Sequence, residues 1–117
     1  MKKYEHDLLT NDNTAVYHEA VFNFNAPHNF QVLKNETAEI LANIHFQEGP
    51  VKENGLNGVF NEDLIAMCIC RLEHFQNSEF KCRENAVAIT KLEEALMWLR
   101  KRTLGRQKRN VEGTHTV

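Results

Sequence analysis

The sequence predicts an α+β protein, in which a small N-terminal antiparallel β-meander is followed by a long C-terminal α-helical hairpin that mediates oligomerisation. Two observations favour this fold class. Apolar residues alternate with polar ones as far as residue 46, and after a glycine-rich break they recur at steps of three and four. The length of 117 residues, with 42% hydrophobic and 26% charged, suits one globular domain. We therefore expect residues 1–117 to form a single domain.

The β-meander is expected within residues 15–47. Residues 1–13 are polar and aperiodic, which predicts a flexible tail. Three short runs of strand-like alternation follow, and clusters of turn-forming residues separate them. The runs are 15–24, 29–33 and 38–46.

The helical hairpin is expected within residues 61–109, after the breakers Gly49-Pro50 and Asn54–Gly58. Asn61 is a suitable N-cap for the first helix, because acidic residues follow it in the first turn. The apolar positions of this helix recur at helical spacing: Leu64, Met67, Cys68, Leu72 and Phe75. The second helix should begin near Cys82 and continue through Leu104 toward Arg109, which leaves 110–117 as a C-terminal tail.

The second helix predicts self-association. Its first stripe alternates in steps of three and four, close to a heptad seam: Cys82, Asn85, Ile89, Leu92, Leu96, Leu99 and Thr103. A second stripe comprises Ala88, Ala95 and Trp98. A helix of about 22–27 residues is roughly 33–40 Å long, which exceeds the diameter of a compact domain of this mass. One short helix and a meander cannot cover it, so we expect a homo-oligomer; the alternative is a monomer with a frayed basic end.

Several function classes are disfavoured. No apolar run approaches the length of a membrane span, and charges interrupt any signal-peptide core near the N-terminus. The three cysteines are expected to be reduced and buried as small hydrophobic residues. Neither they nor the six scattered histidines have metal-ligand spacing, and no catalytic motif is present. We therefore expect no enzyme activity, no metal and no cofactor.

Charge is divided along the chain. Residues 1–80 contain five basic and twelve acidic residues, a net charge of −7, whereas 81–109 contain nine basic and three acidic, a net charge of +6. This asymmetry favours acidic-on-basic packing between molecules or an anionic ligand, and a solvated helix end is the alternative. Guanidinium groups bind phosphates well, and Arg102, Arg106 and Arg109 share one helix face by spacing. The candidates for stacking on a base are Phe75, Phe80 and Trp98, although for Phe75 alone core packing is the commoner role.

The C-terminal two-thirds of the chain resembles the phage-encoded Thoeris anti-defence protein one family, which shares its helical hairpin with the anti-CBASS protein two. The most specific segment is Cys82-Arg83-Glu84-Asn85-Ala86 together with Lys91-Leu92-Glu93-Glu94-Ala95-Leu96-Met97-Trp98-Leu99. The other matching segments are Glu48-Gly49-Pro50-Val51-Lys52-Glu53, Asn57-Gly58 and Val111-Glu112-Gly113-Thr114.

The resemblance implies a signal sponge. Bacterial Thoeris defence makes a cyclic ADP-ribose isomer that activates a killing effector, and proteins of this family bind that signal (glyco-cyclic ADP-ribose) without cleaving it. They act in the cytoplasm of the infected bacterial host, assemble through their helices, commonly as hexamers, and some hold cyclic oligonucleotides of CBASS signalling at separate sites. No membrane and no nucleic acid polymer is implied as a partner.

The resemblance also implies roles for individual residues. Phe75 would stack on a purine, Asn85 would hydrogen-bond the ligand and Arg102 would bind the pyrophosphate, with Arg83 and Arg106 as electrostatic neighbours. One departure is Asn110, where the family pattern leads us to expect glycine. Asparagine tolerates a left-handed backbone, so the turn is expected to persist.

Two other functions stay open. A basic helix end could bind a nucleic acid backbone, although the charge of −7 over residues 1–80 would repel a long polyanion. An enzyme that degrades the same signal is the second alternative.

Overall fold

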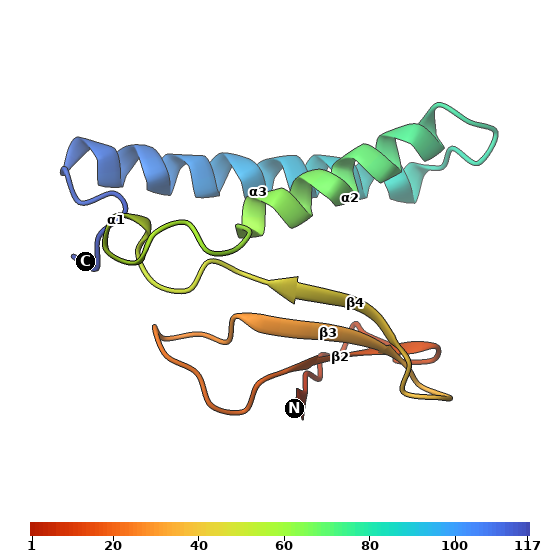
Figure 1. The fold of residues 1–117 in the computed structure, drawn as a ribbon. Helices are drawn as coiled ribbons and strands as arrows, with labels where there is room; N and C mark the ends of the chain where they lie inside the picture. The colour runs from red at the N-terminus through yellow and green to blue at the C-terminus, as the bar shows by residue number, and fades with distance from the viewer. The chain divides into compact units, whose positions relative to one another are not determined.

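The chain begins with a four-stranded antiparallel sheet and ends with two long helices, which confirms the α+β order (Figure 1). A computed structural model describes all residues 1–117. They divide into two compact units, Met1–Val59 and Phe60–Val117. That these units fold together as one domain stays a prediction.

The sheet of the first unit has the strand order β1-β2-β3-β4. The strands are β1 (Lys2–Lys3), β2 (Thr14–His18), β3 (Asn29–Lys34) and β4 (Ile40–His45). The meander of β2, β3 and β4 agrees with the sequence, but β1 lies in the segment that was expected to be a flexible tail. Lys2 and Lys3 pair with His18 and Tyr17 of β2. A strand of two residues has no periodicity, so alternation could not predict it.

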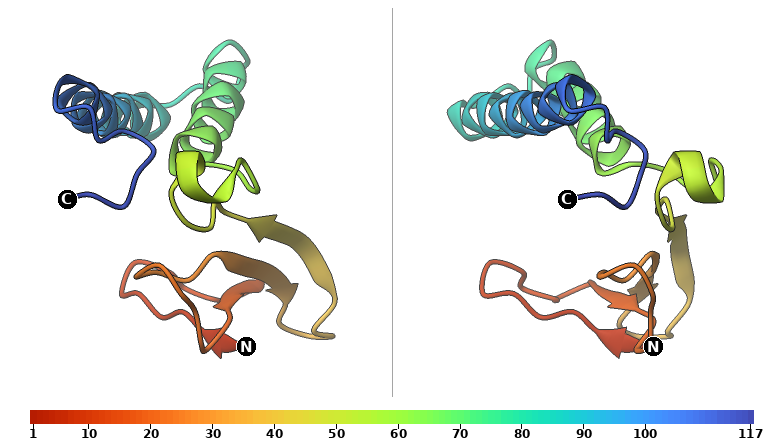
Figure 2. Two further views of the ribbon diagram at one scale, coloured as in Figure 1. Left: turned by 60° about the vertical axis from the view of Figure 1, so that its left-hand side comes forward. Right: turned by 90° about the vertical axis from the view of Figure 1, so that its left-hand side faces the viewer.

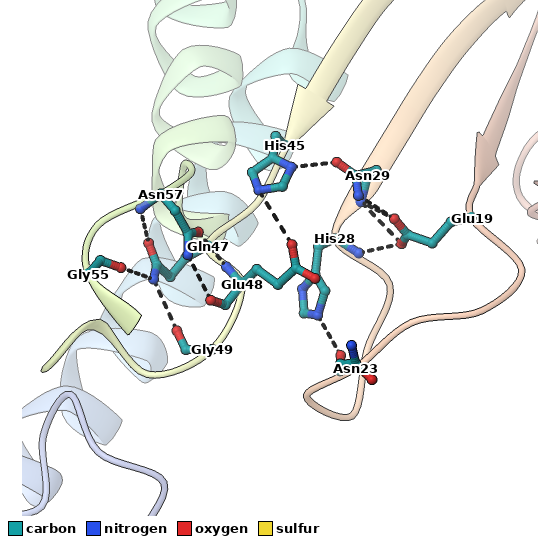
Figure 3. A network of polar contacts seen from close by, with 10 residues as sticks. All are labelled: Glu19, Asn23, His28, Asn29, His45, Gln47, Glu48, Gly49, Gly55 and Asn57. Atoms are coloured by element: carbon teal, nitrogen blue, oxygen red, sulfur yellow. Dashed lines mark hydrogen bonds and ion pairs between the residues drawn. The ribbon is translucent and has the colours of Figure 1, made fainter. Parts of the chain in front are cut away.

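Glu19 ends β2 earlier than alternation predicts. Its carboxylate accepts hydrogen bonds from the N–H groups of His28 (2.7 Å) and Asn29 (3.0 Å), across the β2–β3 loop (Figure 3). Phe24 and Asn25 in this loop have positive φ angles of 56° and 71°, which turn the chain back. The side chains beyond His18 therefore belong to a loop, although their alternation continues as far as Phe24.

The segment that follows β4 is closed by side-chain amides. The side chain of Gln47 donates to the carbonyl oxygens of Gly49 (3.0 Å) and Gly55 (2.7 Å) and accepts from the N–H of Asn57 (2.9 Å) (Figure 3). The short helix α1 (Val51–Asn54) lies inside this loop. Glycine is required at position 58, because the backbone of Phe46 lies so close that a Cβ on Gly58 would be 2.5 Å from the Phe46 carbonyl group. The loop is therefore specifically folded.

The second unit contains the predicted hairpin of α2 (Asn61–Gln76) and α3 (Arg83–Lys108), which run side by side (Figures 1 and 2). Asn61 is not the N-cap of α2. It is the first helical residue, and the N-cap is Phe60, whose N–H donates to the Asp63 carboxylate at 2.8 Å. Asp63, in the acidic first turn that suggested Asn61 as the N-cap, therefore provides the hydrogen-bond acceptor at the start of the helix with its own side chain. The α3 prediction is confirmed, including its extension past Gly105.

Half-buried residues mark the faces that α2 and α3 turn toward each other. On α3 they include both predicted stripes except Trp98 and the N-cap Cys82: Asn85, Ala88, Ile89, Leu92, Ala95, Leu96, Leu99 and Thr103. On α2 they are Glu62, Leu64, Ile65, Ile69, Leu72 and Gln76. Met67 and all three cysteine thiols are exposed, so the prediction that the thiols are buried is wrong. The hairpin has only two layers, so a helix side turned away from its neighbour stays uncovered within the unit.

The chain has almost no dry core. Ala15 is the one buried apolar residue, and neither α2 nor α3 contains a fully buried residue. The accessible surface is 9002 Å². Even two separate compact units of half this mass each would expose only about 7,900 Å² together. Apolar surface is thus left uncovered by the chain itself. No helix combines the length and the apolar character needed to cross a membrane.

Candidate functional site

Phe75 lies in the last turn of α2 and is only partly packed. Its side chain is 39% exposed, and the guanidinium carbon of Arg71 lies 5.4 Å from the ring centroid. These residues are four apart, so they lie on the same side of the helix. A cation beside an aromatic ring is stabilised by the ring's quadrupole. The pair offers an aromatic surface with a positive charge at its side, which is suited to a base that carries phosphate.

Gln76 ties the end of α2 to the start of α3. Its side chain donates to the carbonyl of Cys82 (3.0 Å) and accepts from the N–H of the same residue (2.9 Å). Cys82 is the N-cap of α3, and its sulfur accepts from the N–H of Asn85 at 3.4 Å. The half-buried Asn85 is therefore held at the same end of the hairpin as Phe75. Its side-chain amide forms no hydrogen bond within the chain, so it can bind a ligand.

Arg102 lies far from this end of the hairpin. It follows Asn85 by 17 residues in one continuous helix, a separation of about 26 Å along the axis. Arg83, the first residue of α3, is exposed and lies at the Asn85 end. One chain therefore brings together Phe75, Asn85 and Arg83, and it places Arg102 at the opposite end of α3.

Arg106 is occupied by the C-terminal tail, which turns back beside the end of α3 (Figure 2). One guanidinium nitrogen lies within hydrogen-bond distance of three carbonyl oxygens, those of Val111 (3.0 Å), Thr114 (3.0 Å) and Thr116 (2.8 Å). Asn110 begins this turn with a φ of 58°, which confirms the left-handed conformation expected there. In this conformation Arg106 cannot direct those donors at a phosphate. Arg102 is exposed and has no such partner.

Sequence reasoning missed two residues of the site. Arg71 was detectable, because an Arg four residues before an aromatic residue in a helix is a local signal. Gln76 was not, because its contacts with Cys82 depend on the conformation of the intervening loop. The other stacking candidates, Phe80 and Trp98, are 67% and 68% exposed. They are available for contact with a partner or ligand.

The polar cluster of the first unit has a structural role. His28, the one buried polar residue, has its Nε2 2.6 Å from the carbonyl oxygen of Asn23. Burial raises the pKa of the Glu19 carboxyl, but hydrogen bonds from His28 and Asn29 outweigh it and leave the pKa below its ordinary value. Asn29 also contacts His45, whose other ring nitrogen lies 3.8 Å from the Glu48 carboxylate. No group of three acidic, histidine or cysteine side chains could hold a metal ion.

Comparison with known proteins gives two findings. Residues 38–104 match the family described as Acb2/Tad1, hairpin domain. The curated protein "Thoeris anti-defense 1" of Bacillus phage SBSphiJ7 is 51% identical over 140 residues, and the match covers 98% of this chain and 99% of that protein. The family match includes α2 and most of α3. It therefore contains Phe75, Asn85 and Arg102.

Proposed function

Because the chain belongs to the Acb2/Tad1 hairpin family of phage anti-defence proteins, we propose that it sequesters a cyclic ADP-ribose-type immune signal without cleaving it. Binding would keep the signal, glyco-cyclic ADP-ribose, away from the Thoeris effector. This action would take place in the cytoplasm of the infected host.

The observation that carries the proposal is the tied end of the hairpin. Phe75 offers a partly exposed ring with Arg71 beside it, and Asn85 presents a free amide one loop away. The ring would stack on the purine of the signal, and the amide would hydrogen-bond it. The contacts that Gln76 makes with Cys82 would hold the two groups in place before the ligand arrives, which lowers the entropic cost of binding.

One chain brings Arg71 and Arg83 to this end of the hairpin, but it does not bring Arg102, the residue that the resemblance assigns to the diphosphate. Arg83 is within the same helix turn as Asn85, whereas Arg102 is about 26 Å away along α3. We propose that Arg102 of a neighbouring copy binds the pyrophosphate, and that the protein assembles through its helices as the family resemblance implies, as a hexamer. The uncovered apolar surface of the helices supports self-assembly.

The proposed role is non-catalytic. The thiol–imidazole pair next to Phe75 is poorly placed for hydrolysis, because Cys70 Sγ lies 3.8 Å from His74 Nδ1, which instead lies 2.8 Å from the Cys70 carbonyl oxygen. Binding alone would remove the signal. The resemblance extends the proposal to cyclic oligonucleotides of CBASS signalling at separate sites. A nucleic acid polymer is the weaker candidate, because Arg106 and Arg109 already donate to carbonyl oxygens of the tail.

Native mass spectrometry tests the proposal with a panel of cyclic ADP-ribose isomers, cyclic oligonucleotides and a short DNA duplex. We expect a cyclic ADP-ribose isomer to bind at an affinity that changes little between 50 mM and 200 mM salt. Polymer binding would instead weaken steeply with salt, because condensed counterions are released. Duplex binding with no affinity for any cyclic ADP-ribose isomer would contradict the proposal.

A further inference from the structure

The loop that joins α2 to α3 carries a second aromatic side chain close to Phe75 (Figure 1). Phe80 lies in this loop and is 67% exposed. Single exposed aromatic residues are common on protein surfaces, so exposure alone assigns no role to Phe80. Apart from the Arg71 guanidinium beside Phe75, neither ring contacts another ring or a cation of the chain. The surface of the Phe80 ring is therefore available to a ligand.

A single hydroxyl group connects the backbones of the two aromatic residues. The Oγ of Ser78 donates to the carbonyl oxygen of Phe75 at 2.6 Å and accepts from the N–H of Phe80 at 3.1 Å. Because both groups contact the same oxygen, the Phe75 carbonyl oxygen and the Phe80 nitrogen lie within about 6 Å of each other. The loop therefore holds the two residues close together, although they are separated in the sequence.

We propose that Phe80 forms a second aromatic wall of the signal site, so that the purine is bound between Phe80 and Phe75. A base has two aromatic faces, and stacking on Phe75 alone leaves one of them in water. A second ring would remove that face from water as well and add a further stacking contact. In this arrangement Ser78 is a positioning residue. The inference rests on the proposed function and adds a residue that selects a planar base.

The charged residues around the two rings favour a base that carries phosphate. Arg71 lies beside Phe75, with its guanidinium carbon 5.4 Å from the ring centroid. Lys81 lies in the loop and Arg83 begins α3, and all three cations are exposed. The loop contributes one acidic residue, Glu79, which is also exposed. Arginine and lysine bind phosphate through charge-assisted hydrogen bonds, so these surroundings suit a nucleotide better than an apolar partner surface.

The exposure of Phe80 separates a binding role from a packing role. Most of its side chain is already in water, so truncating it removes little buried apolar area and should leave the melting temperature almost unchanged. Ser78 is exposed as well. Water can replace the Ser78 hydroxyl at the Phe80 N–H, so loss of the hydroxyl should affect the position of the loop more than the stability of the hairpin.

Calorimetry with glyco-cyclic ADP-ribose tests the second wall. Phe80→Leu keeps an apolar side chain and removes the aromatic ring, so we expect it to weaken binding about tenfold or more. Phe80→Tyr keeps the ring and should bind as the wild type does. The matched control is Leu56→Ala, because Leu56 is an equally open apolar residue of the first unit, 71% exposed. This control should leave the affinity unchanged.

A pair of Ser78 variants tests the positioning role in the same assay. Ser78→Ala removes the hydroxyl and should weaken binding, whereas Ser78→Thr retains a hydroxyl that can make both hydrogen bonds and should restore most of the affinity. Equal losses in the two variants would show that the hydroxyl does not position Phe80.

The outcomes separate this inference from the proposed function. If the wild type binds no cyclic ADP-ribose isomer, the proposed function itself fails. If the wild type binds the signal and Phe80→Leu binds equally well, or if Phe80→Tyr loses as much affinity as Phe80→Leu, the second wall is refuted and the proposed function stands. Thermal melts and sedimentation velocity accompany each variant. A lowered melting temperature or an altered assembly in Phe80→Leu would identify a packing or contact residue and would also overturn the inference.

Discussion

Replacing Phe75 separates a stacking surface from a packing residue. About three-fifths of the side chain is covered in the hairpin, which is roughly 90–150 Å² of an aromatic side chain. At about 25 cal/mol per Å², Phe75→Ala should cost about 2–4 kcal/mol of stability. Loss of stacking on a base should cost about 1–3 kcal/mol of binding, a ten- to hundredfold loss in affinity.

Phe75→Leu keeps most of the apolar volume and removes the aromatic ring. We expect a stability cost below about 1.5 kcal/mol, as for other volume-conserving changes, together with the full loss of stacking. Thermal melts without ligand give the stability, and calorimetry with a cyclic ADP-ribose isomer gives the affinity. If Phe75→Leu binds as the wild type does while Phe75→Ala loses stability and binding together, Phe75 is a packing residue and the stacking assignment is refuted.

Three further predictions concern the surroundings of the site and the sheet. Gln76→Ala should lower the free energy of unfolding by about 1–2 kcal/mol and weaken signal binding, because two hydrogen bonds to Cys82 are lost. Denaturant titration measures the change in stability. The control is Gln107→Ala, because Gln107 is exposed and its side chain forms no hydrogen bond. Gly58→Ala should destabilise the first unit by about 1–3 kcal/mol, because its Cβ would overlap the Phe46 backbone, and unchanged amide exchange in β4 would argue against this. The lowered pKa of Glu19 stabilises the fold at pH values above the ordinary glutamate pKa near 4.3, and this stabilisation is lost as the pH falls through the lower pKa of the folded state. Glu19→Gln should therefore reduce the dependence of the denaturation midpoint on pH in the acidic range.

The elements with strong periodicity were predictable from the sequence. The second helix was placed within a few residues at both ends, because its apolar positions repeat over more than six turns. Strand β1 was not predictable, since its two residues form a strand only by pairing with His18 and Tyr17. The end of β2 was also missed, because the Glu19 carboxylate binds N–H groups nine and ten residues away. Such contacts leave no local pattern.

The site was predictable as a set of residue types but not as an arrangement. The resemblance gave Phe75, Asn85 and Arg102 as one group, whereas a straight helix separates the last two by about 26 Å. A motif marks which residues share a role, and it does not say whether one copy of the chain supplies them all. The hydrogen bonds between Arg106 and the tail were not predictable either, because their acceptors are backbone carbonyl oxygens, which every residue possesses.

The fate of the bound signal tests the central claim most directly. The protein is loaded with a cyclic ADP-ribose isomer, separated from free ligand and denatured by heat, and the released small molecule is then analysed by mass spectrometry. We predict that the ligand is recovered intact, in an amount equal to that bound, and that the supernatant again activates a Thoeris effector. Release of a cleaved or ring-opened product would identify an enzyme, and release of no ligand at all would contradict binding itself.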